Sequence, residues 1–138
     1  MMIPYRHQAG GPDEFPADYQ LLLNIRRRAA DLVNVKLAKS GGLSAARTLL
    51  ELARAQGMGT ILGCMLESEI GTGAAASLVA AYGTTMVSDL DAVWWLQCPA
   101  VVGGMRYQGA AVVLPDAPSR GISGLVAAEA RDAREARA

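Results

Sequence analysis

Apolar residues along the chain gather in short runs that polar and glycine-rich segments separate. Three of these runs are brief, contain β-branched side chains and lack helical spacing, which predicts buried strands. They cover residues 32–38 (LVNVKLA), 60–66 (TILGCML) and 84–91 (TTMVSDLD). Near-continuous apolar runs are typical of a parallel sheet that is covered on both faces. We therefore expect a core in which three strands lie parallel.

Helical spacing appears between the predicted strands. Residues 16–30 begin with a proline, which suits a first helical turn, and end in arginines that favour the negative end of the helix dipole. Ser44 is the expected N-cap of a second helix that ends near Gly57, and a small-residue helix is expected over 73–83. The loops between these elements are expected at 39–42 and 67–73. This order predicts an α/β fold with a parallel βαβαβ core and right-handed crossovers.

The two ends of the chain lack this alternation. The first residues are rich in proline and glycine and are expected to be irregular. Residues 101–116 are expected to form a β-hairpin with its turn at Gln108-Gly109. The last residues are rich in Ala, Arg and Glu, which predicts a helix or a disordered tail. The predicted units are an irregular segment, the α/β core, a hairpin with a return segment, and the tail, over residues 1–16, 17–100, 101–122 and 123–138.

Composition narrows the class to one globular domain. Hydrophobic residues make up 51% and charged residues 19% of the 138 residues, enough for a core. Basic and acidic residues number 13 each, and this balance argues against a nucleic-acid binder or a membrane-surface binder. No run of about 18 apolar residues predicts a transmembrane helix, and the N-terminus lacks a signal core, so a cytoplasmic protein is expected. Cys64 and Cys98 have no metal-binding spacing and are expected to be buried thiols.

The carboxyl ends of parallel strands are where such folds bind ligands, so the residues there are the first candidates for chemistry. Lys36 lies inside an apolar run, Cys64 and Glu67 follow the second strand, and Asp89 and Asp91 end the third. A lysine that loses its water holds its proton less tightly and can act as a base near neutral pH. The alternatives are a lysine on an edge strand, a glutamate that caps the following helix, and a solvated pair of aspartates.

Three sequence blocks occur in order and resemble a known family. They are NVKLAKSGGL at 34–43, GCMLESEIGTGAAASLVAA at 63–81 and SDLD at 88–91. Together they resemble the C-terminal part of the enolase superfamily barrel, nearest to the muconate-lactonizing-enzyme subgroup and, within it, the dipeptide epimerases. The tail PAVVGGMRYQGAAVVLPDAPSRGIS is similar to the return segment of that family. The resemblance covers roughly residues 17–124 and implies a partial, half-barrel-like TIM barrel.

The resemblance implies roles for the strand-end residues. Lys36 matches the proton-transferring lysine at the end of the sixth barrel strand, and Glu67 ends the seventh strand on the substrate side. Asp89 and Asp91 match the Asp-x-Asp pair that binds the substrate's ammonium group in dipeptide epimerases. The negative charge of the two carboxylates suits the binding of a positively charged ammonium group. The small-molecule ligand implied is a carboxylate or a dipeptide.

The resemblance also implies a divalent metal, usually Mg²⁺, which three acids hold and which stabilises an enolate. In this sequence Asp13 is the one candidate for these ligands, and a turn residue is the alternative at that position. Two of the three expected acids are missing, so this chain alone is not expected to hold the metal. The family's Gly-Pro after Asp-x-Asp is replaced by Ala92-Val93, with Trp94-Trp95 behind it.

Three functions remain open at this point. The first is a truncated enolase-superfamily barrel without independent catalysis. The second is an active metal-dependent epimerase or cycloisomerase assembled from more than one chain. The third is a non-catalytic, self-associating scaffold. Since no segment is available to fill the inner face of the predicted sheet, a homodimer that buries this face with Trp94-Trp95 is expected.

Overall fold

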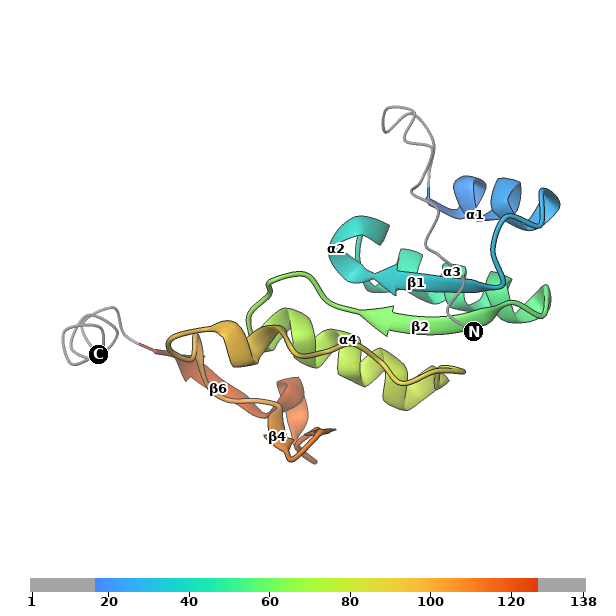
Figure 1. Ribbon diagram of the computed structural model, residues 1–138. Coiled ribbons are helices and arrows are strands. Elements are labelled where there is room, and N and C mark those ends of the chain that lie inside the picture. The colour runs from blue at the N-terminus through green and yellow to red at the C-terminus, as the bar shows by residue number, and fades with distance from the viewer. Residues whose placement is uncertain (1–16, 127–138) are drawn as a thin grey trace.

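The computed structural model describes residues 17–126, so the expectations for 1–16, Asp13 among them, and for 127–138 lie outside the described residues. Figure 1 shows from top to bottom α1, two strands with α3 behind them, α4, and the small C-terminal strands. The elements are α1 Ala17–Arg26, β1 Leu32–Lys36, α2 Leu37–Ser40, α3 Leu43–Ala55, β2 Gly59–Gly63, α4 Glu69–Tyr82, η1 Ala92–Trp95, β3 Val101–Gly103, β4 Arg106–Gln108, β5 Ala111–Val113, η2 Pro118–Gly121 and β6 Ile122–Leu125.

β1 and β2 form a parallel pair, as expected from their apolar runs. Leu32 aligns with Gly59, and Lys36 aligns with Gly63. One face of the pair packs against the helices: Val35 and Leu62 are buried there with the apolar side of α3. Burial of these side chains, each contributing about 1.5–3 kcal/mol, is the main stabilising term in this part of the chain.

The third predicted strand, 84–91, is wrong as a regular strand. The segment runs alongside β2, but it forms a single parallel bridge with it, between Asp89 and Gly63. Earlier in the segment the backbone N–H groups of Thr85 and Met86 both donate to the carbonyl of Thr60, and the Thr85 hydroxyl donates to the same oxygen. Threonine hydroxyls thus compete with the backbone ladder, which explains why the regular pairing fails.

The helix boundaries differ from the expectation at four points, the first being α1, which ends at Arg26 and not at residue 30. Residues 37–40 form a helical turn where the end of a strand (37–38) and the start of a loop (39–40) were expected, and α3 begins at Leu43 with Gly42, not Ser44, as its N-cap. α4 begins at Glu69, four residues before the predicted start. The end of α3 is as expected: Gly57, at a φ of 67°, takes the left-handed conformation, and the N–H of Met58 reaches back to the carbonyl of Ala53.

The C-terminal residues form two separate antiparallel pairs. The predicted hairpin is confirmed in its β4–β5 half, where Arg106 pairs with Val113 and Gln108 with Ala111. β3 pairs instead with β6, so the strand expected at 101 belongs to another pair. A side chain at Gly103 would collide with the carbonyl of Gly121, which explains the glycine there. β6 crosses the expected boundary at 122/123 and is a strand where a helix or tail was predicted.

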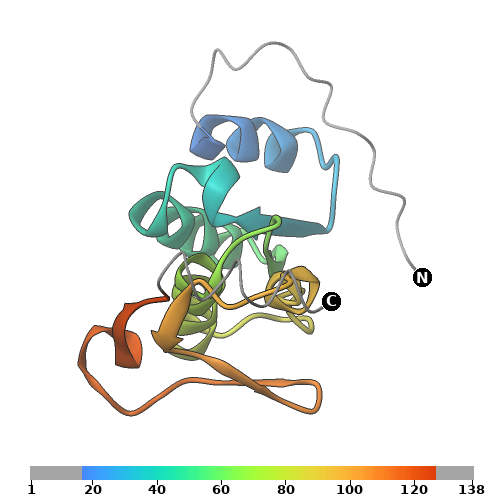
Figure 2. The ribbon, with the colours of Figure 1, turned by 90° about the vertical axis from the view of Figure 1, so that its left-hand side faces the viewer.

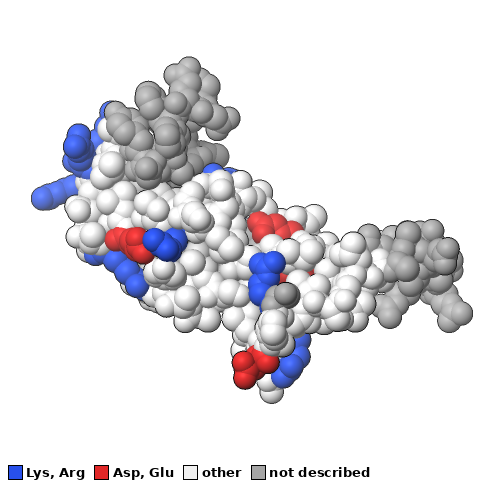
Figure 3. All heavy atoms as spheres, turned by 180° about the vertical axis from the view of Figure 1, so that it is seen from behind, with Lys and Arg blue, Asp and Glu red and all other residues white. Residues whose placement is uncertain are grey.

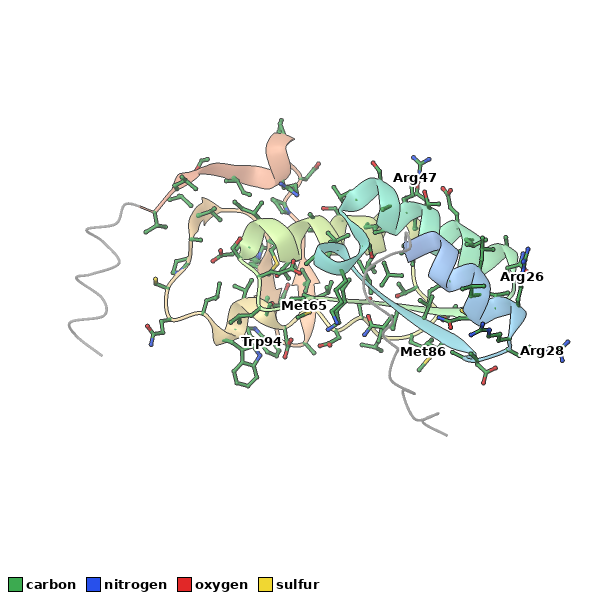
Figure 4. All side chains as sticks on the ribbon, turned by 90° about the horizontal axis from the view of Figure 1, so that it is seen from above. Arg26, Arg28, Arg47, Met65, Met86 and Trp94 are labelled. Atoms are coloured by element: carbon green, nitrogen blue, oxygen red, sulfur yellow. The ribbon has the colours of Figure 1, made fainter. Side chains whose placement is uncertain are left out.

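Figure 2, turned by 90° from Figure 1, shows the helices gathered beside β1 and β2 and the hairpin set apart from them. The open face of β1 carries Asn34 and a half-buried Lys36, so the inner face, which the near-continuous apolar runs predicted to be apolar, is partly polar. Exposed apolar side chains gather elsewhere, and Figure 4 shows Met65, Met86 and Trp94 on the side of the molecule opposite to Arg47 of α3.

Charge is spread thinly over the surface. Figure 3 shows small groups of charged side chains with wide uncharged areas between the groups; within some groups Lys or Arg lies beside Asp or Glu, and basic side chains lie at the end where α1 is. In residues 17–126, none of the helices combines the length and the apolar character that a membrane crossing requires.

Candidate functional site

Three strand-end residues lie in one row. Lys36 aligns with Gly63 in the β1–β2 register, and Gly63 aligns with Asp89 across the isolated bridge. Residues that align across a sheet project from the same face, so the side chains of Lys36 and Asp89 leave the same side of the sheet at the same end. The sequence predicted both residues at one rim, and the register confirms that placement. It does not test what they do there.

Lys36 reaches across the end of β2. Its Nζ donates a 2.8 Å hydrogen bond to the carbonyl of Cys64, the residue that follows β2. Gly63 makes room for this path, because a Cβ there would lie 3.0 Å from Lys36 Cε and 2.8 Å from Asn34 Oδ1. The main chain at Lys36 is also fixed, since its carbonyl accepts a hydrogen bond from the Ser40 hydroxyl. The ammonium is therefore held at the rim by the carbonyl of Cys64, and Ser40 of α2 fixes the main chain that carries it.

Glu67 lies in the loop before α4. Its Oε1 accepts the backbone N–H of Met65 at 3.1 Å, which closes the loop on itself. The N-cap of α4 is Ser68, so the alternative in which Glu67 caps the helix is not the arrangement found. Its Oε2 lies over Gly71, where a Cβ would come within 2.5 Å. A glycine in the first turn of the helix thus lets this carboxylate lie against it.

The two aspartates differ in their surroundings. Asp89 is exposed, and both of its backbone groups pair with the end of β2: its N–H donates to Leu62 and its carbonyl accepts from Cys64. Asp91 precedes the short helix η1, and its Oδ2 accepts the indole N–H of Trp95 at 3.1 Å. The pair is therefore not a uniformly solvated strand end, because one of its members is held by an aromatic donor.

Cys64 marks the point where the acids converge. Its burial raises the pKa of the thiol most, the backbone N–H of Ala92 lowers it by less, and the carboxylates of Asp89, Asp91 and Glu67 each raise it by a smaller amount. The expectation of a buried thiol is confirmed here, whereas Cys98 is only partly buried. All three predicted substrate-side acids thus act on one thiol at the end of β2.

Sequence reasoning missed Tyr107 as a part of this region. Its hydroxyl donates a 2.7 Å hydrogen bond to the carbonyl of Leu90, the residue between the two aspartates. Its ring packs on Trp94 with centroids 4.7 Å apart, and burial raises the pKa of the phenol. No local spacing signals a contact that spans 17 residues of sequence. The replacement of the family's Gly-Pro by a segment with two tryptophans was the nearest hint.

A groove of about 580 Å³ lies beside the acid pair. It is lined by residues of the segment 84–91, by the second half of α4 and by the β4–β5 hairpin, including Asp89, Asp91, Trp94 and Tyr107. Side chains from both faces of the segment line it, so the groove follows the unpaired backbone edge of that segment. It is an edge groove rather than a pocket centred on Lys36.

The described residues do not fit a magnesium site. Among residues 17–126, no group of three or more His, Cys, Asp or Glu side chains is placed to hold a metal ion. Mg²⁺ needs several oxygen ligands in octahedral arrangement, and the acids around Cys64 do not supply them. Asp13, the predicted ligand, lies outside the described residues.

Comparison with known proteins points to one family. Among curated relatives, the chain is 42% identical over 101 residues to the L-Ala-D/L-Glu epimerase of Clostridium acetobutylicum, covering 73% of this chain and 28% of the relative. It is 36% identical over 104 residues to the chloromuconate cycloisomerase of Cupriavidus pinatubonensis, covering 71% and 27%. The chain therefore spans less than a third of the length of these relatives.

Comparison with solved structures points to the same family. A substrate-liganded complex of the L-Ala-D/L-Glu epimerase from Bacillus subtilis matches with a TM-score of 0.73 and 34% identity, over 79% of this chain and 30% of that one. The dipeptide epimerase of Enterococcus faecalis, complexed with Mg and the dipeptide L-Leu-L-Tyr, matches with a TM-score of 0.70 and 33% identity, over 76% and 30%. The model of the enolase C-terminal domain-like family matches residues 19–125. This α/β chain belongs to the enolase C-terminal domain-like family and is related to dipeptide epimerases and muconate cycloisomerases.

Proposed function

We propose that this chain forms the part of a dipeptide-epimerase site that binds the substrate's ammonium group and carries one proton-transferring lysine. In this proposal residues 17–100 are a fragment of a (β/α) barrel, and 101–122 are the hairpin and return segment. Lys36 is the acid–base residue, and Glu67, Asp89 and Asp91 face the substrate. The chain alone binds the ligand without turning it over.

The observation that carries the proposal is the row Lys36–Gly63–Asp89 at the end of the sheet. An ammonium donor and a carboxylate on one rim can hold a zwitterionic amino compound by its two ends. The amino group pairs with the acid, and the carboxylate or carbonyl side faces the lysine. The α-carbon next to the carboxylate then lies between these groups, where the lysine Nζ can take the α-proton as a neutral amine or return it as an ammonium.

The acid pair favours a dipeptide over a muconate. A muconate carries two carboxylates and no cationic group to offset them, so Asp89 and Asp91 would repel it at the rim. Like charges at close range cost free energy unless a metal or a cation intervenes. The free ammonium of a dipeptide gains from the same two carboxylates. Among the two activities found in the relatives, the epimerase type therefore suits these side chains better.

Independent catalysis is not expected, because removal of an α-proton next to a carboxylate creates charge that needs strong stabilisation. Losing one stabilising donor of that kind typically costs about 10²–10³-fold in rate. In the described residues, the acids that surround Cys64 are not arranged to hold the metal that would supply it. We propose that Mg²⁺ does not bind tightly to this chain alone.

An exchange assay tests the expected absence of turnover, and a calorimetric titration tests the expected absence of tight Mg²⁺ binding. The chain is incubated with L-Ala-L-Glu and Mg²⁺ in D₂O, and α-proton exchange and epimerisation of the Glu residue are followed by ¹H NMR. We expect no turnover above the buffer. Turnover that EDTA and Lys36→Ala both abolish would contradict the claim of inactivity, and calorimetric titration with Mg²⁺ checks the metal separately.

A self-associating scaffold is the second candidate, and the exposed apolar surface favours it. Val87 is 89% exposed and Trp95 is 72% exposed, with Met86 and Trp94 also exposed on this part of the chain. Patches of this kind commonly mark an interface. We propose a homodimer through this surface. Sedimentation equilibrium at micromolar concentration should give twice the mass of the 14.4 kDa chain, and a clean monomer would reject the dimer.

A further inference from the structure

The segment 84–91 has one backbone edge that β2 engages and one edge that is free. Both backbone groups of Asp89 pair with the end of β2. Successive residues of an extended chain direct these groups to opposite edges, so Ser88 and Leu90 direct theirs away from β2. Within residues 17–126, no hydrogen bond engages the N–H or the carbonyl of Ser88, or the N–H of Leu90. An unpaired edge of this kind is a template for another strand.

Ser88 is the centre of the unpaired stretch. On its two sides, the Thr84 hydroxyl donates to the carbonyl of Met86 at 2.8 Å, and the Tyr107 hydroxyl donates to the carbonyl of Leu90 at 2.7 Å. Each of these carbonyls keeps one lone pair for a further donor, whereas both backbone groups of Ser88 are unused. A strand that adds to this edge is therefore expected to be centred on Ser88.

The groove of about 580 Å³ runs along the same edge, between Val79 and Ala80 of α4 and Val112 and Leu114 of the hairpin region. A strand residue fills about 160 Å³, given a rise of about 3.3 Å, a strand spacing of about 4.8 Å and a sheet spacing of about 10 Å. The groove therefore has room for about four residues of extended chain, with apolar side chains on its walls.

The segment is suited to pair with a second copy of itself. In an antiparallel pair centred on Ser88, Met86 lies opposite Leu90 of the second copy, which places two apolar side chains together on one face. On the other face Val87, which is 89% exposed, lies opposite Asp89 of the second copy. A pair centred one residue later would place the two Asp89 side chains directly opposite each other, and like charges in that position destabilise a strand pair.

We propose that the segment 84–91 pairs antiparallel with the same segment of a second copy, with Ser88 on the two-fold axis. The N–H of each Ser88 donates to the carbonyl of the other, and the N–H of each Leu90 donates to the Met86 carbonyl of the second copy. A second copy is favoured as the partner, because the two-fold axis uses the same free groups twice and the chain has no net charge to repel a copy. The inference rests on the self-associating scaffold proposed above and names the surface and the register of that association.

Amide hydrogen exchange of the full chain, followed by NMR at micromolar and at near-millimolar concentration, tests the pairing without a substitution. The N–H of Ser88 has no partner within residues 17–126, so its exchange should slow at least about tenfold at the higher concentration. The N–H of Asp89 is the matched control on the next residue. It already donates to Leu62, so its exchange should be slow at both concentrations.

Cysteine cross-linking tests the register. In a Cys98→Ser background, Ser88→Cys places two thiols across the axis with their Cα atoms about 5.5 Å apart, within the range of a disulfide. Met86→Cys is the control on the same exposed segment, because in this register the two Cα atoms lie about 14 Å apart. We expect mild oxidation to give a covalent dimer with Ser88→Cys and monomer with Met86→Cys.

The outcomes separate the pairing from the scaffold on which it rests. A clean monomer in sedimentation equilibrium rejects the homodimer, and the pairing is rejected with it. A dimer in which the Ser88 amide exchanges equally fast at both concentrations, or in which Met86→Cys cross-links as readily as Ser88→Cys, keeps the scaffold and overturns the strand pairing. Slow exchange of the Ser88 amide in the monomer would mean that another segment of the same chain covers this edge, and the second copy would be wrong.

Discussion

Residues 17–83 and residues 84–126 are stabilised in different ways. The first part has two paired strands and two long helices that bury leucines such as Leu50 and Leu62 almost completely. The second part has strands of three or four residues and short helical turns, and many of its apolar side chains are exposed. Besides its two short strand pairs, it is held by single hydrogen bonds from side chains to distant backbone groups. Lys36 therefore lies in the better packed part, residues 17–83. The Asp89–Asp91 pair lies in residues 84–126, at the place where this less well packed part contacts β2.

The largest expected loss of stability comes from a cavity made in residues 17–83. Leu50 is 1% exposed and belongs to the main apolar cluster. We expect Leu50→Ala to lower the free energy of unfolding by about 2–5 kcal/mol, because the helix layer cannot close the space left. Urea unfolding followed by circular dichroism measures the change. The control is Leu125→Ala, at a site that is 75% exposed in β6, where the change should stay within about 0.5 kcal/mol.

Glu69 links the two parts. This buried carboxylate in the first turn of α4 accepts the backbone N–H of Ala100 with both oxygens, at 3.3 and 3.2 Å. We expect Glu69→Gln to cost about 1–2 kcal/mol in the free energy of unfolding, because a charge-assisted bond becomes a neutral one at a helix N-terminus. Hydrogen exchange should show the loss first around β3.

The matched control is Glu51→Gln on α3. Glu51 pairs with Arg47 at 3.3 Å, and both side chains are at least half exposed. An exposed pair of this kind contributes less than about 0.5 kcal/mol. Equal costs at Glu69 and Glu51 would contradict the view that the C-terminal part is held through Glu69.

The two thiols allow the two parts of the chain to be compared by their chemical reactivity, since Cys64 lies in residues 17–83 and Cys98 in residues 84–126. Cys64 is buried and the pKa of its thiol is raised, whereas Cys98 is partly exposed. We expect iodoacetamide at pH 8 to alkylate Cys64 at least about tenfold more slowly than Cys98, because the thiolate is the reactive form. Mass spectrometry of timed samples measures both rates. In urea the two rates should become equal.

The same thiol predicts a pH effect on stability. Its folded-state pKa lies above the ordinary value of 9.0, so its stabilising effect is full below that value and is lost as the pH rises through the folded-state pKa. The free energy of unfolding should therefore fall more steeply above pH 9 than in the Cys64→Ala variant. Parallel slopes for the two proteins would show that the thiol is not protonated preferentially in the folded chain.

The smallest expected change is a gain at Thr72. Its Oγ1 is buried in α4, and no hydrogen-bond partner for it is found within residues 17–126. A hydroxyl buried without a partner is unfavourable, and valine has nearly the same shape. Thr72→Val should raise the free energy of unfolding by up to about 1 kcal/mol in urea titration. A loss of that size would mean that the hydroxyl has a partner.

Much of the first part could be predicted from the sequence, because its signals are local. The β-branched run at 32–36 and the glycine at the end of α3 depend only on neighbouring residues. The start of α4 was missed because EIGTG reads as a loop, and its first turn is held by the distant Ala100. The pairing of β3 with β6 was missed for the same reason, since about 20 residues separate the partners.

The candidate site divides in the same way. The row from Lys36 to Asp89 could be predicted, because parallel strands bring their carboxyl ends to one edge. The contacts of Trp95 and Tyr107 could not, because they depend on how the return segment packs against the rim. The contacts that Trp95 and Tyr107 make around the acid pair could therefore be identified only from the three-dimensional structure.

The central claim is that the carboxyl ends of these strands form one ligand-binding rim, and amide NMR tests it most directly. The ¹⁵N-labelled chain is titrated with L-Ala-L-Glu, and the opposite ends of the same strands serve as the internal control. We predict shifts concentrated at Lys36, Cys64 and Asp89, with little change at Leu32, Gly59 and Thr85. Shifts concentrated at the opposite ends, or no shifts at millimolar ligand, would contradict the account.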